Sequence, residues 1–289
     1  MLTIDLRDEM PGSFALYLFG DTHVGNVSSS DDTIESFVRK VKGTKHGFAS
    51  LGGDQFETIP LTDKRFAMDT HHSKTRWGAQ RDHLINLLDP LGRKLWWALD
   101  GNHEKTIAND YLINEDLRKH FNTHDAGEGF TYTIKALFPG FRLLDWHGMG
   151  SVNSKAGDAH QRERNDEIKV KRKLRDLPAD DCEVNVMHHI HKMRISKPIV
   201  ALNMVTDPTR CNLEQTYTEP SRIWIDQKKE IYRIPEEERW YASSGAALKT
   251  YDEGISGYGE VFGFRATEMG CIVVRVKNDK VQTVEKVRL

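Results

Sequence analysis

The chain has 289 residues, a formal net charge of −2 and 29% charged residues. Its length suits one large α/β domain or two smaller ones, and the near-neutral charge excludes a uniformly basic nucleic-acid-binding surface. Three cysteines lie far apart in the sequence, at Cys182, Cys211 and Cys271. Their spacing excludes a cysteine-rich zinc site and a disulfide framework, and is typical of a protein in a reducing cytosol.

Membrane segments are not indicated by the sequence. No apolar run reaches the roughly 18 residues that a membrane-spanning helix needs. Residues 1–9 also lack the basic start and apolar core of a signal peptide. We therefore expect a cytoplasmic protein that does not act at a membrane.

The first predicted elements form a strand–helix–strand unit. An apolar run over 14–19 predicts a buried strand that ends at Gly20. A helix over 31–41 follows, capped by Ser30 and ended by Gly43. A second strand over 48–51 runs into Gly52-Gly53-Asp54. Such a crossover predicts that the two strands are parallel.

The remaining elements change from alternating strands and helices to mostly strands. Helices are predicted over 82–91 and 158–177, and strands over 94–99, 130–137, 141–146, 184–187, 198–205, 240–243, 271–276 and 280–287. An α/β fold with two mixed sheets packed together under outer helices fits this order.

Most of the predicted strands in the first two thirds of the chain are followed by a carboxylate, an amide or an imidazole. These residues are Asp21 and His23, Asp54, Asn102 and His103, His147, and His189 and His191. Ligands bind at the carboxyl ends of strands in open α/β sheets, so these groups can meet at one rim. Singly, Asp54 reads as a turn former and His147 as an ordinary strand-end residue. Their recurrence favours a site for two cations, with Asp54 as the carboxylate that bridges them.

These motifs resemble those of the calcineurin-like metallophosphoesterases. The resemblance lies in Gly20-Asp21-Thr22-His23-Val24-Gly25, Gly53-Asp54, Gly101-Asn102-His103-Glu104, a lone His147, and His189-Ile190-His191. It covers residues 14 to about 192 and is looser beyond. It implies a four-layer αββα sandwich forming one domain over 1–289. Segments near 62–81, 152–180 and 193–240 would then be insertions on the substrate side.

The resemblance also implies a ligand set. One ion would be held by Asp21, His23, Asp54 and His191, and the other by Asp54, Asn102, His147 and His189. His103 would face the scissile phosphate as a general acid or as a donor to the developing charge, with Glu57 orienting it. Two cations that activate a water would supply the nucleophile. Manganese is the first choice for both ions, with iron, zinc or nickel as alternatives.

Two departures from the family pattern bear on function. His188 stands where a glycine usually precedes the final His-x-His, so it competes with His189 as a ligand. Strand alternation makes His189 and His191 the pair that faces the same way, and favours them. After Asp54 the chain lacks the Asp-Arg-Gly of phosphoprotein phosphatases, which argues against a protein phosphatase.

Three segments are candidates for substrate contacts. The first is basic and aromatic, with Lys64, Arg65, Lys74, Arg76 and Trp77, and suits a phosphate backbone with base stacking. A solvated loop with one buried Trp is an equal alternative. The helix over 158–177 is rich in Arg and Lys, for which a solvated face is favoured. Region 193–240 is a candidate cap, and the glycines at 245–263 indicate a flexible loop over the site or hairpin turns.

The sequence therefore predicts a metal-dependent phosphodiesterase or nuclease whose substrate is DNA, RNA or a nucleotide. One alternative is a phosphomonoesterase acting on a small molecule or a phosphoprotein. The alternative from another class is a non-catalytic scaffold with the same fold.

Overall fold

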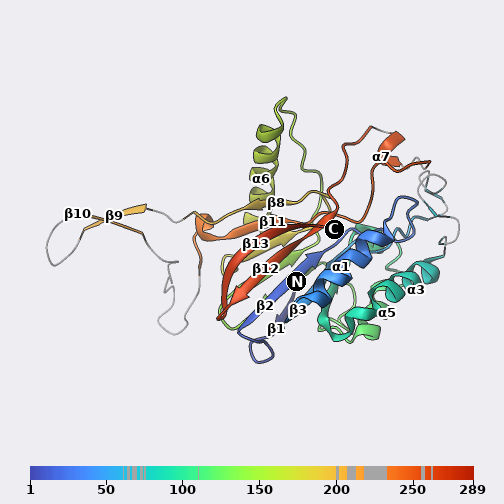
Figure 1. The fold of residues 1–289 in the computed structure, drawn as a ribbon, viewed down its shortest axis with the longest axis horizontal. Helices are drawn as coiled ribbons and strands as arrows, with labels where there is room; N and C mark the ends of the chain where they lie inside the picture. Colours follow the sequence, from blue (N-terminus) through green and yellow to red (C-terminus); the bar gives the residue numbers. More distant parts are fainter. Residues whose placement is uncertain are drawn as a thin grey trace.

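Two mixed β-sheets packed face to face, with helices on their outer faces, form the core of the computed structural model (Figure 1). The structure describes residues 1–60, 62–63, 66, 70–71, 74, 76–109, 111–199, 202–206, 213–217, 233–254, 258–261 and 263–289. Within these ranges no helix is both long and apolar enough to cross a membrane.

One sheet has five strands in the order β13-β12-β2-β3-β4. These are β13 (Lys280–Arg288), β12 (Gly270–Lys277), β2 (Ser13–Phe19), β3 (Gly47–Gly52) and β4 (Leu95–Leu99). The neighbouring strands β2, β3 and β4 are parallel, as the strand–helix–strand pattern predicts for the first two, whereas β12 runs antiparallel to β2 and β13. The carboxyl ends of the three parallel strands therefore lie at one edge.

The other sheet has six strands in the order β1-β5-β6-β7-β11-β8. These are β1 (Leu2–Asp5), β5 (Thr133–Leu137), β6 (Arg142–Trp146), β7 (Val184–Met187), β11 (Trp240–Ser243) and β8 (Arg194–Ser196). β6, β7 and β11 are parallel, so their ends also share an edge. β9 (Leu202–Thr206) and β10 (Leu213–Tyr217) form a separate antiparallel pair.

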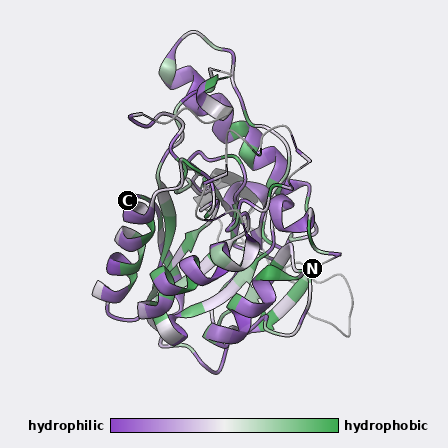
Figure 2. Ribbon diagram, turned by 90° about the vertical axis from the view of Figure 1, so that its right-hand side faces the viewer, coloured by the Kyte–Doolittle hydropathy of each residue, from purple (hydrophilic) through white to green (hydrophobic). Residues whose placement is uncertain are grey.

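The alternation of side chains along β2 explains the layers. Phe14, Leu16 and Leu18 belong to the apolar cluster between the sheets, together with residues of β5, β6 and β7. Ala15, Tyr17 and Phe19 point the other way and pack under the helices. A strand buried on both faces reads as the continuous apolar run seen in the sequence. Figure 2 shows the resulting pattern of apolar strands inside polar helices.

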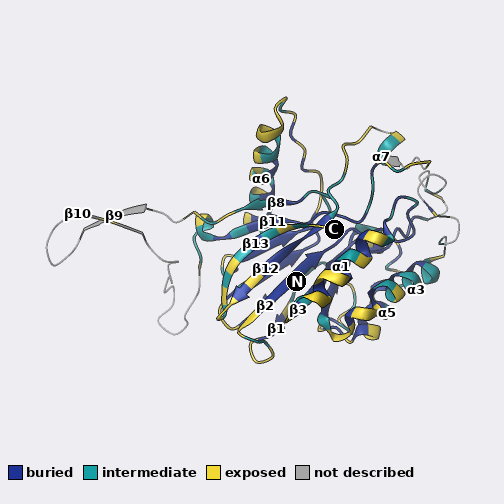
Figure 3. Ribbon diagram, viewed as in Figure 1, coloured by how far each residue is buried: buried dark blue, intermediate teal, exposed yellow. Residues whose placement is uncertain are grey.

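Helices cover both outer faces, and their buried sides are apolar (Figure 3). The five-stranded sheet is covered by α1 (Asp31–Gly43), α3 (Trp77–Leu88), α5 (Ile113–Phe121) and the 3-10 turn η2 (Asp89–Lys94). The six-stranded sheet is covered by α6 (Ala159–Arg175). The short helices are α4 (Asn102–Lys105), α7 (Tyr258–Val261) and the 3-10 turn η3 (Glu236–Glu238).

The predicted architecture of two packed mixed sheets with flanking helices is confirmed, and several boundaries differ. Ser30 caps α1 by accepting from the N–H of Thr33, as its position indicates. The helix predicted over 82–91 begins earlier, as α3, and ends at Leu88. The chain then continues as the 3-10 turn η2, because Pro90 has no N–H to donate and Gly92 has a φ of 51°. The predicted 198–205 strand corresponds to the later β9. The strand β1 and the helix α5 were not predicted from the sequence.

Candidate metal centre

The polar residues after the strands converge on one rim, where the carboxyl ends of the parallel strands of both sheets meet. Asp21 and His23 follow β2, Asp54 follows β3, and Asn102 and His103 follow β4. From the other sheet, His147 follows β6, and His189 and His191 follow β7. Three overlapping groups of these side chains place their ligand atoms within 4.8 Å of one another.

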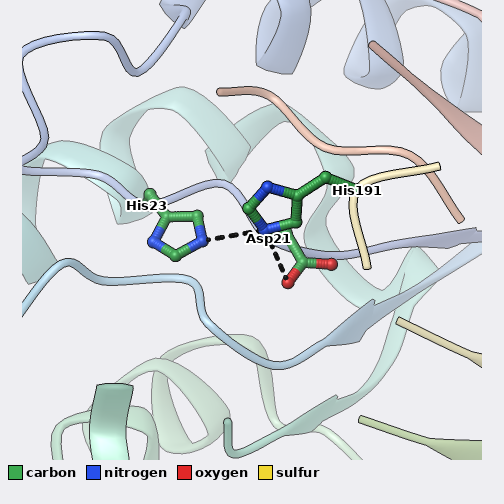
Figure 4. Close-up of side chains that lie close together, drawn as sticks. All are labelled: Asp21, His23 and His191. Atoms are coloured by element: carbon green, nitrogen blue, oxygen red, sulfur yellow. Dashed lines mark hydrogen bonds and ion pairs between the residues drawn. The ribbon is translucent and has the colours of Figure 1, made fainter. Parts of the chain in front are cut away.

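The first group is Asp21, His23 and His191, shown in Figure 4. The Nε2 atoms of His23 and His191 lie 3.3 Å apart, and Nε2 of His191 lies 3.4 Å from Oδ1 of Asp21. Asp21 is fully buried and His23 nearly so. Two imidazoles and a carboxylate at this separation suit a divalent transition metal.

The second group is Asp54, His147 and His189. Oδ2 of Asp54 lies 3.4 Å from Nε2 of His147 and 3.9 Å from Nδ1 of His189. The amide Oδ1 of Asn102 lies 3.2 Å from the same nitrogen of His147. Asp54 also belongs to the third group, with His23 and His103. Its position between the groups is the one that a bridging carboxylate needs.

Hydrogen bonding at the rim leaves lone pairs that face one another. Nδ1 of His147 lies 2.7 Å from the carbonyl O of Gly52 and carries a proton, so Nε2, which faces Asp54 and Asn102, is the atom that would give its lone pair to a cation in place of a second proton. Among the described residues, Oδ1 of Asp21 and Nδ1 of His189 are buried without a hydrogen-bond partner. Buried acceptors without a donor are costly, and a cation placed among them removes that cost. The donor set therefore fits the two divalent ions that the sequence motifs imply.

The charges at the rim point the same way. Burial acts to raise the pKa of Asp54, but the positive charges of His147 and His103 outweigh it and hold that pKa well below its usual range. Burial lowers the pKa of His147, yet the charge of Asp54 raises it to about 9. Asp54 is therefore ionised, and the site attracts a positive charge, whether a proton or a metal ion.

The backbone at the rim is held in an uncommon conformation. Asp21, His23, Asp54, His189 and His191 all have a positive φ, between 47° and 73°. Non-glycine residues rarely adopt this left-handed region, and such strain gathers at functional sites. Gly53 shows how close the packing is, because a Cβ there would lie 2.3 Å from Nδ1 of His147.

His103 lies beside the candidate ligands and lines the cleft above them. Its backbone N–H donates to Oδ1 of Asp54 at 2.9 Å, and its Nδ1 donates to the carbonyl O of Glu57 at 2.6 Å. Burial lowers the pKa of His103, but the charges of Asp54 and Glu57 raise it to about 9. These neighbouring carboxylates therefore favour a protonated His103.

Glu57 contacts His103 differently from the sequence-based expectation. The main-chain oxygen of Glu57, not its carboxylate, orients the ring of His103. The carboxylate instead lies 3.0 Å from Nδ1 of His23, with its other oxygen 3.8 Å from His103. The predicted partner thus supports both histidines, and its side chain fixes the tautomer of His23.

Glu104 supports the rim, a role that was not predicted from the sequence although the residue belongs to the Gly101-Asn102-His103-Glu104 motif. Its carboxylate accepts the N–H groups of Asp54 at 3.1 Å, Phe56 at 3.0 Å and Gly101 at 2.7 Å. It is 2% exposed. The side chain therefore joins the loop after β3 to the loop after β4. Its place beside Asn102 and His103 was the available signal.

His188 lies beneath the rim and does not face the cleft. Its ring is fully buried, with Nε2 2.8 Å from Oδ1 of Asp145 and Nδ1 2.6 Å from Oγ of Ser244. A Cβ on Gly52 would lie 2.2 Å from this ring. His189 and His191 occupy the rim, as expected. Both residues lie in a turn after β7 and have positive φ angles. The alternation of side chains along a strand is therefore not what makes them face the same way.

A cleft of about 690 Å³ lies above the rim. It is lined by all the candidate metal ligands except Asp21 and His147, by Ser151, Asn153 and Ser154, and by 248–250, Gly259 and 263–267. Gly259 and Gly263 thus belong to a segment that walls the cleft, as one reading of the glycine-rich stretch predicts.

The basic stretch over 62–81 does not contribute described residues to the cleft lining. Lys74 lies 3.8 Å from Asp31, and Trp77 packs against the core under the helices. Arg76 is exposed at the start of α3. Lys64 and Arg65 lie outside the described residues, as do 200–201, 207–212 and 218–232 of the candidate cap over 193–240.

Comparison with known proteins gave matches only among solved structures. No protein-family profile and no curated protein sequence matches the chain. A metallophosphoesterase from Sphaerobacter thermophilus shares 11% identity at a TM-score of 0.38, over 96% of this chain and 88% of its own. A purple acid phosphatase from yellow lupin (Lupinus luteus) seeds shares 9% identity at a TM-score of 0.39, over 96% of this chain and 54% of its own. A protein serine/threonine phosphatase from Saccharomyces cerevisiae shares 12% identity at a TM-score of 0.37, over 100% of this chain and 84% of its own.

All three names denote phosphoesterases or phosphatases, the class that the motifs of this sequence resemble. At TM-scores below 0.5 these likenesses decide nothing about the site. The assignment of this chain depends on its own motifs and on the geometry of its rim.

Proposed function

We propose that this chain is a dinuclear metal-dependent phosphoesterase that hydrolyses phosphodiesters. The observation that carries the proposal is the convergence of seven candidate ligands at one rim, with His103 beside them and a cleft above. The ligands are Asp21, His23, Asp54, Asn102, His147, His189 and His191. A scaffold without catalytic activity has no need of a complete ligand set held in strained backbone.

Manganese remains the first choice for both ions, with iron, zinc and nickel as alternatives, because carboxylate, amide and imidazole donors are mixed. When bound, two divalent ions supply Lewis-acid charge and lower the pKa of water toward neutrality. Asp54 would contact both ions. Glu57 would hold His23 with its Nε2 toward the metal through the 3.0 Å contact at Nδ1.

His103 would act on the leaving group. Its Nδ1 is engaged by the carbonyl of Glu57, which leaves Nε2 for the substrate. The charges of Asp54 and Glu57 raise the pKa of His103 and so favour the protonated ring. A protonated imidazole in the cleft can donate to the departing oxygen or to the charge that develops on phosphorus oxygens.

The charge of the cleft favours a diester over a monoester. Among the described cleft residues, Lys192 pairs with Asp166 at 3.1 Å and Lys249 with Asp252 at 3.2 Å. Arg265 is exposed there without an ion-pair partner in the described chain. Beside the metal ligands and His103, this leaves one unpaired cationic side chain in the described lining for the substrate, which suits the single charge of a diester better than the double charge of a monoester.

Hydrolysis of bis-p-nitrophenyl phosphate and of p-nitrophenyl phosphate by manganese-loaded protein tests this proposal. We expect diester turnover to exceed monoester turnover. The His103→Ala variant should lose about 100-fold or more in kcat, the range for a lost general acid, and Asp54→Asn should also lose activity because the ions lose their shared carboxylate. His160→Ala, an exposed histidine outside the cleft, is the matched control and should retain activity. Equal inactivity of wild type and variants on both esters would refute the proposal.

A further inference from the structure

Two surface hollows continue the cleft toward helix α6. The inner hollow, about 270 Å³, lies between residues 150–153 and residues 189–191. The outer hollow, about 440 Å³, lies between residues 153–156 and one side of α6. Asn153 lines the cleft and both hollows, and His189 and His191 line both the cleft and the inner hollow. Together the hollows form a side groove that leads away from the metal centre.

The lining of the side groove contains cations and no carboxylate among the described residues. Lys155, Lys169 and Arg172 all line its outer hollow. Lys155 and Arg172 are exposed, and neither has an ion pair within the described chain. In the cleft, by contrast, the lining carboxylates are confined to the metal side, at Asp54 and Glu57. The potential along the groove is therefore positive although the net charge of the chain is −2.

The three acidic residues of α6, Glu163, Asp166 and Glu167, do not line the groove, and two of them are paired elsewhere. Glu163 lies 2.6 Å from Nζ of Lys286, on the last strand. Asp166 is buried and lies 3.1 Å from Nζ of Lys192. The basic side of α6 toward the groove thus differs from an ordinary solvated face, on which charges of both signs are mixed.

The wall of the groove is fixed by contacts to both neighbours. Nζ of Lys192 donates to the carbonyl O of Val152 at 2.7 Å and to Oδ1 of Asn153 at 2.8 Å. On the other side, Nδ2 of Asn165 donates to Oγ of Ser154 at 3.0 Å. Nζ of Lys169 donates to the carbonyl O of Asn153. A wall held by these contacts provides a site that is formed before a ligand binds.

We propose that the side groove binds the sugar-phosphate backbone of a polynucleotide next to the scissile phosphate. This inference rests on the proposed phosphodiesterase function and names its substrate class. A polynucleotide carries one negative charge at every linkage, so a strand held at the metal centre places its next phosphates along this path. Lys155 and Arg172 would pair with those phosphates, while Asn153 and neighbouring hydroxyl groups would position the backbone without reading sequence. Figure 1 shows α6 and the segment that bears α7 on the same side of the molecule.

Charge reversal in the groove tests the inference through binding. Full-length protein carrying His103→Ala, which prevents turnover, is titrated with labelled single-stranded oligonucleotides of increasing length and followed by fluorescence anisotropy. We expect affinity to rise with length. With Lys155→Glu and Arg172→Glu added, affinity for the longer strands should fall about 10-fold or more. Two lost phosphate contacts should also lower the slope of log K against log salt by about 1.4, at roughly 0.7 per contact.

The control variant carries Lys42→Glu and Lys280→Glu, which change the net charge equally at exposed positions away from the groove. It should bind like the parent. DNA and RNA strands of one sequence are compared, and length-dependent binding of either supports the groove. An equal loss in both double variants, or no dependence on length, would overturn it. Wild-type turnover of bis-p-nitrophenyl phosphate is measured in parallel, so failure of the phosphodiesterase proposal is detected separately.

Discussion

Nε2 of His188 lies 2.8 Å from Oδ1 of Asp145 in the space between the two sheets, beneath the candidate metal centre. Oδ2 of the same carboxylate accepts from Nε1 of Trp97 at 2.7 Å, and Ser244 contacts the other ring nitrogen of His188. Gly52 gives the ring its space. This buried polar network joins strands of both sheets just below the loops that carry the candidate ligands.

Replacing His188 with Ala should therefore destabilise the protein. The change leaves the fully buried Asp145 with one partner fewer and creates a cavity, so we expect a loss of about 2–4 kcal/mol in unfolding free energy. Urea denaturation measures it. His188→Gln keeps a polar group of similar size and should recover part of the loss. A change of less than about 0.5 kcal/mol, typical of surface substitutions, would contradict a structural role.

Metal removal should lower thermal stability. The rim gathers buried carboxylate, amide and imidazole groups, and an ion that binds them only in the folded state adds about 2.7 kcal/mol at 100 times its Kd. We expect the melting temperature to fall in a chelator and to return with manganese. The Asp54→Asn variant should show a smaller response. Coincident melting curves with and without metal would exclude a cation at this rim.

Glu104→Gln should weaken the site without touching a ligand. The carboxylate accepts three backbone N–H groups, and an amide offers one oxygen and a competing NH₂ donor. We expect a loss of about 1–3 kcal/mol in stability and weaker manganese binding by calorimetry. Glu115→Gln, at a half-buried position on α5, is a comparison outside the rim. Unchanged manganese affinity in Glu104→Gln would show that the loops keep their positions without this carboxylate.

Glu183 provides a pH dependence away from the metal centre. Burial raises the pKa of its carboxyl to about 7, above its ordinary value of 4.5. The folded state then holds a proton that the unfolded chain releases. This contribution to stability is fully present below pH 4.5 and is lost as the pH rises through 7. Glu183→Gln removes the titration, so its stability relative to wild type should rise by about 1–2 kcal/mol between pH 5 and 8. Parallel urea curves at both pH values check the sign.

The elements that were predicted from the sequence are those whose hydrophobic pattern or capping residue matches their burial and hydrogen bonding in the folded protein. The apolar run at β2 and the Ser30 cap of α1 are examples, since each depends on neighbours in the chain. The strand β1 was missed because it is short and its pairing partner, β5, lies more than 120 residues away. The helix α5 was missed because it has several charges and its cap, Leu112, carries no capping side chain.

At the rim, residue types and their order after strands predicted which side chains come together. They did not predict which partner each side chain would find. The carboxylate of Glu57 contacts His23, and the buried network around His188 depends on Asp145 and Ser244, which are distant in sequence. Such contacts follow from how the sheets pack, and no local pattern encodes them.

The candidate ligands come from both sheets, and this origin has a mechanical consequence. Asp21, His23 and Asp54 follow strands of the five-stranded sheet, whereas His147, His189 and His191 follow strands of the six-stranded sheet. A cation held between them would add a cross-link between two layers that are otherwise joined at that end by apolar packing and by the buried network of Asp145. Amide hydrogens near both sets of strand ends should then exchange together, and only as fast as the ion departs.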